Sequence, residues 1–472
     1  MTMIAQIDQG SATRPARPTI AIIGGGFTGA TLAFHLARNA VDAQILVIEP
    51  RAQLGAGLAY STQDPSHRIN VPASRMTIDT SQRGDFQQWI EDTGTPLSPG
   101  TQAADGALYP QRAVFGAYVA DRLRPWLLSG RITHIQARAI AVVPGTNYAI
   151  RLDNGRVIRA DHLVIATSHP APGVPTSFAA LTHDARVVTD PSDTGPITAI
   201  ARTARNVLIV GTGLTSADVI ASLERQGFAG RITAMSRRGL RSRGHASDYP
   251  ESEADFASQP ETTALAVLRR IRAAVRTDRA RGLPWQAALD NVRRDGPAIW
   301  AALPQAERAR LVNRLRVWWD VHRFRIAPQV QAVLDDLIAR SRLTLSAGHL
   351  HSATATPAGI AVNWTPRRAT PRRDLFDAVV LTTGPAHGGI IASNPVIASL
   401  ADAGLVRPDA LHLGLEVTDG CRAVGTNGQP SPNLSIAGPL ARGHVGELMG
   451  IPEVTAHAET VAAALSAQLT TI

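Results

Sequence analysis

The feature that most constrains the fold is residues 20–30, in which an apolar run rich in β-branched residues ends in the glycine motif G-x-G-x-x-G. The apolar run predicts a buried parallel strand, and residues 31–37 after the motif have the pattern of a helix. A strand, a glycine turn and a helix in this order are typical of a dinucleotide-binding domain. We therefore predict an α/β fold of the Rossmann type.

The glycine motif is expected to hold the phosphates of a dinucleotide. Its first glycine permits a tight turn, its second lets the backbone approach a pyrophosphate, and its third lets the helix pack closely on the strand. The N-terminus of the helix adds unpaired N–H groups and the positive end of the helix dipole. The cofactor-binding positions predicted here are Gly24, Gly26, Phe27, Thr28 and Gly29.

A second predicted strand, residues 44–48, ends at Glu49, twenty residues after Gly29. A carboxylate at this point accepts hydrogen bonds from ribose hydroxyls and repels a 2′-phosphate. The first turn therefore suits FAD or NAD. A glycine-rich loop without a ligand is the weaker alternative, because strand, turn, helix, strand and acid all occur in register.

The same pattern begins again at residues 206–210, which form another predicted strand. A second glycine turn follows this strand. A serine stands in place of its third glycine and is small enough to keep helix and strand close. The predicted cofactor-binding positions of this turn are Gly211, Gly213, Leu214 and Thr215.

The two turns differ at the position twenty-five residues after their first glycine. That position is Glu49 after the first turn and Ser236 after the second, and Arg237 and Arg238 come next. Arginine beside a hydroxyl accommodates a 2′-phosphate. The second turn therefore predicts NADP(H), with NAD(H) as an alternative cofactor and a solvated basic turn as an alternative role for the arginines.

The composition narrows the class of protein. A chain of 472 residues with 44% hydrophobic residues suggests several soluble globular domains, and no apolar run is long enough to span a bilayer. Residues 1–18 lack an apolar core segment, so we expect a disordered tail rather than a signal peptide, and a cytoplasmic location.

The single cysteine, Cys421, excludes an internal disulfide and a dithiol reductase. All 47 basic residues are arginine, which excludes a lysine Schiff base.

The net charge of +9 raises the question of a nucleic-acid partner. Fourteen arginines against five acidic residues fall between residues 265 and 325, and no DNA- or RNA-binding motif accompanies them. We therefore predict no nucleic-acid, membrane or metal site. A small anionic molecule and a solvated helical face are both compatible with this local charge.

Two further parts of the sequence are candidates for contact with the first cofactor. Pro72 forces Val71 into an extended conformation, so Asn70 and Val71 can run past a ring system, although an ordinary proline turn fits equally well. Arg112 could meet a cofactor phosphate, although a surface salt bridge is the commoner role of such an arginine.

The order of these patterns predicts a split domain organisation. Residues 19–195 and 386–472 are assigned to an FAD-binding domain, and residues 196–385 to an NAD(P)-binding domain. The turn at Gly438, after the last predicted strand, is expected to cover the first cofactor. Residues 132–158 suggest a small antiparallel hairpin, and residues 255–340 a helical insert in the second domain.

The last predicted helix of this insert supplies the candidate substrate site. The candidate substrate-binding residues are Trp319, His322, Arg323 and Arg325. Helical spacing places the first three on neighbouring turns of one face, with Arg325 turned away from them. Such a face could clamp a flat or anionic substrate by stacking and charge-assisted hydrogen bonds. A salt-bridge cluster at a domain interface explains these residues nearly as well.

Several segments together resemble one branch of the flavoproteins with paired dinucleotide-binding domains. They are GGGFTG at residues 24–29, NVPA at 70–73, GTGLT at 211–215 with SRRG at 236–239, WDVHR at 319–323, and AGPL at 437–440. The branch contains the bacterial FAD-dependent urate hydroxylase and the aspartate N-hydroxylase that forms nitrosuccinate. The resemblance implies FAD at the first turn, with its ring near residues 70–73, and NAD(P)H at the second turn.

The resulting hypothesis is an FAD-dependent, NAD(P)H-consuming monooxygenase. It would use molecular oxygen to hydroxylate a small, anionic, nitrogen-containing substrate such as a urate-like purine or an amino acid. The cofactors would carry the chemistry, which explains why no acid, base or nucleophile stands out in the sequence. Two alternatives stay open: an NAD(P)H-flavin oxidoreductase without oxygen insertion, and a sensor protein that binds FAD and NADP without turning them over.

Overall fold

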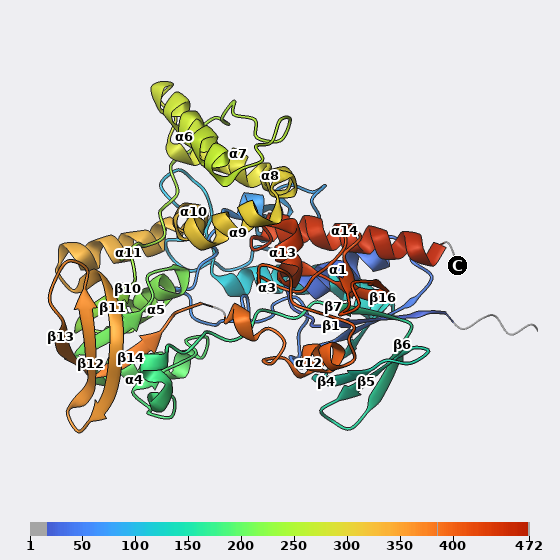
Figure 1. Ribbon diagram of the computed structural model, residues 1–472, viewed down its shortest axis with the longest axis horizontal. Helices are drawn as coiled ribbons and strands as arrows, with labels where there is room; N and C mark the ends of the chain where they lie inside the picture. The colour runs from blue at the N-terminus through green and yellow to red at the C-terminus, as the bar shows by residue number, and fades with distance from the viewer. Residues whose placement is uncertain (1–16, 385, 471–472) are drawn as a thin grey trace, which may run out of the picture.

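The computed structural model describes residues 17–384 and 386–470, in which the chain forms two domains built on mainly parallel sheets and a cap of helices (Figure 1). Residues 1–16 of the predicted tail lie outside the described residues. Within the described ranges, no helix combines the length and the apolar character that crossing a membrane requires.

The first domain is built on a six-stranded sheet in which neighbouring strands run parallel, except for the antiparallel pair at one edge. After Thr19, the strand at residues 19–23 near the centre of this sheet consists of buried apolar residues, as a sheet covered by helices requires. Two strands come from the C-terminal part of the chain. In sheet order the strands are β15 (Arg422–Val424), β16 (Pro430–Ile436), β7 (His162–Ile165), β1 (Thr19–Ile23), β2 (Gln44–Ile48) and β3 (Ile132–Ile135).

The hairpin predicted over residues 132–158 is wrong in its first part. β3 pairs in parallel with β2, because its buried Ile132 continues the first sheet opposite Ile45. The antiparallel unit is a separate sheet, with a turn at residues 153–155 between its last two strands. Its strands are β4 (Ala139–Val143), β5 (Tyr148–Leu152) and β6 (Val157–Ala160).

The second domain is built on a seven-stranded sheet whose centre repeats the parallel strand pairing of the first. In sheet order its strands are β13 (Arg372–Phe376), β12 (Gly359–Pro366), β11 (Leu343–Thr356), β10 (Arg231–Ser236), β9 (Asn206–Val210), β14 (Ala378–Leu381) and β8 (Val187–Val188). The buried β8 pairs with β14. The domain boundary predicted between residues 195 and 196 is therefore wrong, since the second sheet already includes β8.

Helices cover both sheets. In the first domain, α1 (Phe27–Arg38) packs against α3 (Arg112–Leu128) and the C-terminal helix α14 (Ile451–Thr470). In the second domain, α5 (Leu214–Arg225) packs against α4 (Thr194–Thr203) and α11 (Pro328–Ala339). The helical insert predicted to end near residue 340 ends earlier, because α11 also packs on β11 and belongs to the sheet domain.

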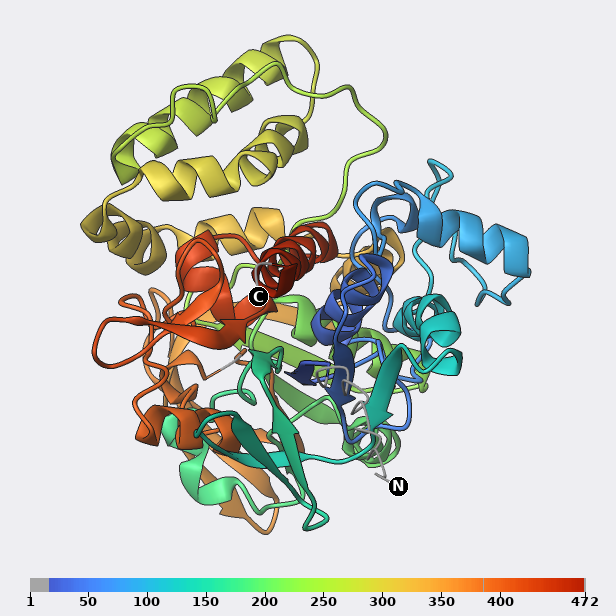
Figure 2. The same ribbon diagram turned by 90° about the vertical axis from the view of Figure 1, so that its right-hand side faces the viewer.

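The cap stands apart from both sheets and has a small apolar core of its own. Its helices are α6 (Ala264–Ala280), α7 (Trp285–Arg294), α8 (Gly296–Ala302), α9 (Gln305–Arg314) and α10 (Arg316–Arg323). Pro284 and Pro304 precede α7 and α9 and separate them from the helices before them. Figure 2 shows the yellow-green cap above the red C-terminal helices α13 (Arg442–Val445) and α14.

The remaining short elements connect these units. They are η1 (Ala73–Arg75), α2 (Asp85–Thr93), η2 (Thr176–Leu181), η3 (His387–Gly389), α12 (Pro395–Asp402) and η4 (Gly438–Ala441).

Candidate cofactor sites and the cap cavity

The first glycine turn joins β1 to α1 in a conformation that residues other than glycine rarely adopt. Gly24 has a φ of +102°, and a Cβ there would lie 2.7 Å from the carbonyl oxygen of Ala166. A Cβ on Gly29 would collide with the carbonyl oxygen of Gly24. Gly26 precedes α1 and offers no side-chain acceptor to its first turn, where Phe27 and the next residues leave N–H groups for a ligand. This cradle fits a pyrophosphate.

Glu49 lies beside this turn, where β2 ends, and is only 4% exposed. Its Oε2 accepts a hydrogen bond of 2.9 Å from the N–H of Gly25. Its Oε1 accepts from the backbone and the guanidinium of Arg51, at 3.1 and 2.9 Å. The carboxylate therefore ties the end of β2 to the glycine turn, and its contact with a ribose stays a prediction.

The second glycine turn has the same strained start but is more open. Gly211 has a φ of +130°, and a Cβ there would lie 2.5 Å from the carbonyl oxygen of Thr382. A Cβ on Gly213 would meet nothing within 4 Å. Helix α5 then begins at Leu214 and Thr215 without a side-chain cap. Free N–H groups and open space at a helix N-terminus fit a second phosphate group.

The basic turn after β10 lies at the surface. Ser236 Oγ accepts a hydrogen bond of 3.0 Å from the N–H of Gly239, so this hydroxyl shapes the turn. Arg237 and Arg238 are exposed. The Arg238 guanidinium lies 5.7 Å from the ring centroid of Trp318 in the cap. Both arginines can be reached by an anion from solvent, and their contact with a 2′-phosphate stays a prediction.

The segment after the basic turn connects the second domain to the cap and to the first domain. The N–H of Arg243 donates to the carbonyl of Val321 in α10 at 2.9 Å. His245 Nε2 lies 3.0 Å from the carbonyl oxygen of Asn70. Burial lowers the pKa of His245 to about 4, so its ring is neutral at pH 7 and donates this hydrogen bond. The half-buried strip at Asn70 and Val71, predicted to lie along the flavin ring, is thereby tied to the second domain.

Arg112 has partners on both domains. Its Nε donates to the carbonyl of Arg68 at 3.0 Å, and its guanidinium forms an ion pair of 2.8 Å with Asp218 of α5. This pair is largely buried, unlike the surface salt bridge considered above. Arg112 therefore joins the two domains, and a phosphate contact stays a prediction.

The turn after β16 reaches the first glycine site. Gly438 has a φ of +76°, and a Cβ there would lie 2.6 Å from the side chain of Thr28. Its N–H donates to Nδ1 of His457 at 3.1 Å. Burial lowers the pKa of His457 to about 4, which keeps this nitrogen free to accept. Gly438 therefore lies against the start of α1, where the first cofactor is predicted.

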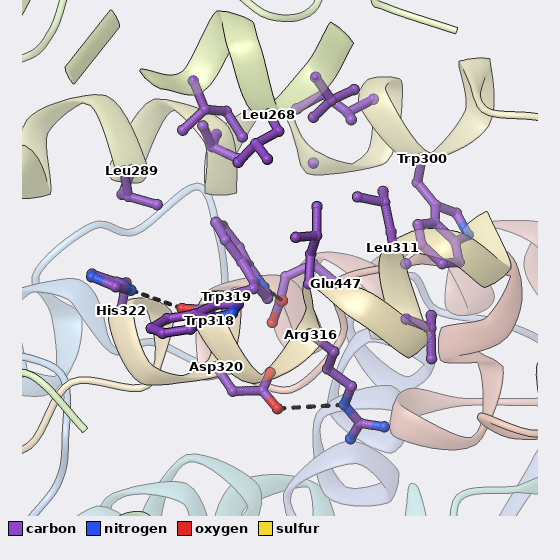
Figure 3. Close-up of a pocket in the computed structure, with 18 of the residues that line it drawn as sticks. Leu268, Leu289, Trp300, Leu311, Arg316, Trp318, Trp319, Asp320, His322 and Glu447 are labelled. Atoms are coloured by element: carbon purple, nitrogen blue, oxygen red, sulfur yellow. Dashed lines mark hydrogen bonds and ion pairs between the residues drawn. The ribbon is translucent and has the colours of Figure 1, made fainter. Parts of the chain in front are cut away.

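A cavity of about 560 Å³ lies between the cap helices and the segment that follows Gly438 (Figure 3). Aliphatic side chains from α6, α7, α8 and α9 form most of its wall. Tryptophans line it as well: Trp285, Trp300, Trp318 and Trp319. Its polar and charged lining residues are Arg272, Arg316, Asp320, His322, Arg442 and Glu447.

Two of the four candidate substrate residues line this cavity. Trp319 lies in its wall and donates from Nε1 to Glu447 at 3.1 Å (Figure 3). His322 also lines the cavity, with Nδ1 2.7 Å from the carbonyl oxygen of Trp318. Trp319 and His322 therefore line the same cavity, and their contact with a substrate stays a prediction.

Arg323 and Arg325 are not among the residues that line the cavity. The Arg323 guanidinium lies 3.1 Å from Glu447 and 3.2 Å from Glu453. Arg325 lies 2.8 Å from Asp290. Both arginines are buried, and a buried charge requires such partners. These two arginines therefore fit the alternative interpretation, a salt-bridge cluster. They do not fit the role of substrate-binding residues.

Sequence reasoning did not single out the cavity residues that come from the first domain. Arg442 and Glu447 lie over a hundred residues after the cap helices, so helical spacing could not associate them with Trp319. The close approach of this segment to the cap is visible in the structure at Gly446, where a Cβ would lie 2.6 Å from the Trp300 ring. Asp320 was also missed, and burial raises the pKa of its carboxyl although Arg316 lies 3.4 Å away.

Comparisons with known proteins agree with this architecture. Residues 21–170 match the family model described as FAD-NAD(P)-binding. None of the curated proteins matches the sequence.

Solved structures resemble the chain along nearly its whole length. Ornithine hydroxylase from Pseudomonas aeruginosa is 15% identical, with a TM-score of 0.65 over 96% of this chain and 100% of that one. L-lysine 6-monooxygenase from Pseudomonas syringae is 18% identical, with the same TM-score and the same coverage. Ornithine N-hydroxylase from Kutzneria sp. 744, solved with reduced FAD, NADP⁺ and L-ornithine, is 14% identical, with a TM-score of 0.61 over 95% and 98%. At such identities the likeness concerns the fold, and the chain therefore has the two-domain α/β fold of the FAD/NAD(P)-binding flavoproteins.

Proposed function

We propose that this protein is an FAD-dependent, NAD(P)H-consuming monooxygenase that hydroxylates a small nitrogen-containing substrate. The observation that carries the proposal is that one chain holds two dinucleotide-type glycine turns and a cap cavity. Two sheets each present an open helix N-terminus, and the cavity is lined by the cap helices and by residues of the first domain. The structural neighbours named above hydroxylate ornithine or lysine, which supports the same class of reaction.

The residues have distinct roles in this proposal. The turn around Gly24 and Gly29 holds FAD, and the turn around Gly211 and Gly213 holds NAD(P)H. The chemistry that the bound cofactors supply is hydride transfer from NAD(P)H to FAD, followed by activation of oxygen. The apolar cap walls exclude water from the substrate, and the carboxyl of Asp320, whose pKa is raised by burial, lies in the same cavity.

The substrate was expected to be a urate-like purine or an amino acid. The likeness to the urate hydroxylase and aspartate N-hydroxylase branch rests on the motifs alone, whereas the solved structures reported above act on ornithine and lysine. We therefore keep an amino compound as the substrate class. Flavin reduction without oxygen insertion, and binding without turnover, are the outcomes that would replace this proposal.

Anaerobic mixing of the FAD-loaded protein with NADPH tests the first half of the reaction. We expect the flavin absorbance to bleach, faster with NADPH than with NADH. A flavin that stays oxidised with both nucleotides, in the presence and absence of amino acids and urate, would contradict a working reductive half-reaction and favour a sensor protein.

Arg237→Ala is expected to change the nucleotide preference. Loss of a charge-assisted contact to the 2′-phosphate should raise KM for NADPH by about 10-fold and leave KM for NADH unchanged. Steady-state oxidation of the two nucleotides measures this shift. Arg202→Ala on α4, which removes another exposed arginine, is the matched control. An unchanged preference in Arg237→Ala would show that this residue does not contact the 2′-phosphate.

A further inference from the structure

Arg442 is a buried arginine without a partner. The residue is 6% exposed, and its guanidinium donates no hydrogen bond and forms no ion pair within the described part of the chain. Its Nε is completely buried. The buried Arg323, by comparison, has two carboxylates within 3.2 Å. The charges of Glu447, Asp320 and Asp409 act on this guanidinium, but none of the three carboxylates is bonded to it. A buried guanidinium without a bonded counter-ion is costly, so the site can accept an anion.

The acids around Arg442 are already engaged elsewhere. Asp320 pairs with Arg316, and Glu447 with Arg323. The carboxylate of Asp409 accepts hydrogen bonds from the backbone N–H groups of residues 411 and 414. Arg316 adds a second positive charge near Arg442. The protein therefore leaves the Arg442 guanidinium free to bind an anion from outside the chain.

The rest of the cavity determines what kind of anion fits. Arg442 lines this cavity. Aliphatic residues such as Leu268, Leu289 and Leu311 and the ring of Trp319 form its apolar wall (Figure 3). Such a wall favours an apolar body and gives a polar ring few hydrogen-bonding partners. Urate and L-aspartate are polar throughout and match the wall poorly.

We propose that the cap cavity binds a substrate with an apolar aliphatic or aromatic body and one carboxylate end, and that Arg442 pairs with this carboxylate. This inference rests on the proposed function in one respect, namely that the bound compound is the substrate of the monooxygenase. Binding itself does not depend on turnover and can be measured separately.

Calorimetric titration of the FAD-loaded protein with hydrocinnamate and its neutral amide tests the pairing. The two probes have the same body, and we expect the carboxylate to bind at least about 10-fold more tightly than the amide. L-aspartate should bind more weakly than hydrocinnamate, since it lacks the apolar body. Equal affinity for the carboxylate and the amide, or tighter binding of L-aspartate, would overturn the proposal.

Substitutions test whether Arg442 causes the preference for the carboxylate. Arg442→Gln should abolish the preference for the carboxylate, and its Tm should not fall, because the variant removes an unpaired buried charge. Arg269→Gln, on the exposed side of α6, is the matched control and should keep the preference. Leu289→Trp should fill the cavity and weaken both probes.

The FAD content of each variant separates the two proposals. Loss of FAD from Arg442→Gln would place this arginine in the cofactor site and overturn the inference. Failure of NADPH to reduce the flavin, with the carboxylate preference intact, would instead contradict only the monooxygenase proposal.

Discussion

Replacing Gly29 with alanine is expected to remove FAD from the protein. The new Cβ would collide with the carbonyl oxygen of Gly24 and lie 3.2 Å from Cγ2 of Ile22. The oxygen belongs to the backbone of the turn itself, so it cannot move away without opening the phosphate cradle. Such overpacking costs at least about 1–3 kcal/mol, enough for a loss of FAD affinity of about 10-fold or more.

The ratio of flavin to protein after purification measures this effect. Gly213→Ala is the matched control, because a Cβ there meets nothing within 4 Å and the backbone is not left-handed. This variant should keep its FAD and its Tm. A Gly29→Ala protein that retains as much FAD as the unaltered protein would contradict the role assigned to the first turn.

Glu453→Ala is expected to cause the largest loss of stability outside the cofactor sites. Glu453 lies in the first turn of α14 and pairs with Arg293 of the cap and with Arg323. Its removal leaves two arginines in a buried site with too few carboxylates. Breaking a buried pair in this way costs about 3–5 kcal/mol, which urea unfolding monitored by tryptophan fluorescence would measure. Asp336→Ala, which breaks an exposed pair with Arg340, should cost less than about 0.5 kcal/mol.

The same network gives stability a defined pH dependence. Burial is the largest single influence and opposes the ionisation of Glu453, but the hydrogen bond from Arg293 and the charges of Arg293 and Arg323 together outweigh it and lower the pKa of Glu453 below its usual value. A carboxylate with a lowered pKa contributes stability above its unfolded value and loses it as pH falls through the folded value. The difference between the unaltered protein and Glu453→Ala should therefore shrink under acid conditions. A difference that grows as pH falls would contradict this account.

The sequence was sufficient to predict the parts of the structure that depend on local pattern. The strands next to Gly24 and Gly211 lie where their apolar runs indicated, because each run is short, β-branched and followed by an obligatory glycine. The position of Glu49 follows from the end of β2. These features are encoded within some thirty residues and require no knowledge of distant contacts.

Features that depend on long-range pairing could not be predicted in this way. β3 and β8 are short strands whose sheet is decided by which neighbours they meet across the chain. Arg323 was expected to face a substrate. The sequence of its helix gives no indication that Glu447 and Glu453, from the C-terminal region, form ion pairs with it. The unpaired state of Arg442 has no local signal in the sequence either.

The most direct test of the central claim is whether oxygen from O₂ enters an organic product. The FAD-loaded protein would be supplied with NADPH, ¹⁸O₂ and a panel of amino acids that includes L-ornithine, L-lysine, L-aspartate and L-phenylalanine, with urate as a further compound. Mass spectrometry of the products and peroxide assays would account for the NADPH consumed. We expect one ¹⁸O atom in a hydroxylated product, formed in step with NADPH. NADPH consumption that ends only in hydrogen peroxide or a reduced electron acceptor for every compound would contradict the monooxygenase assignment.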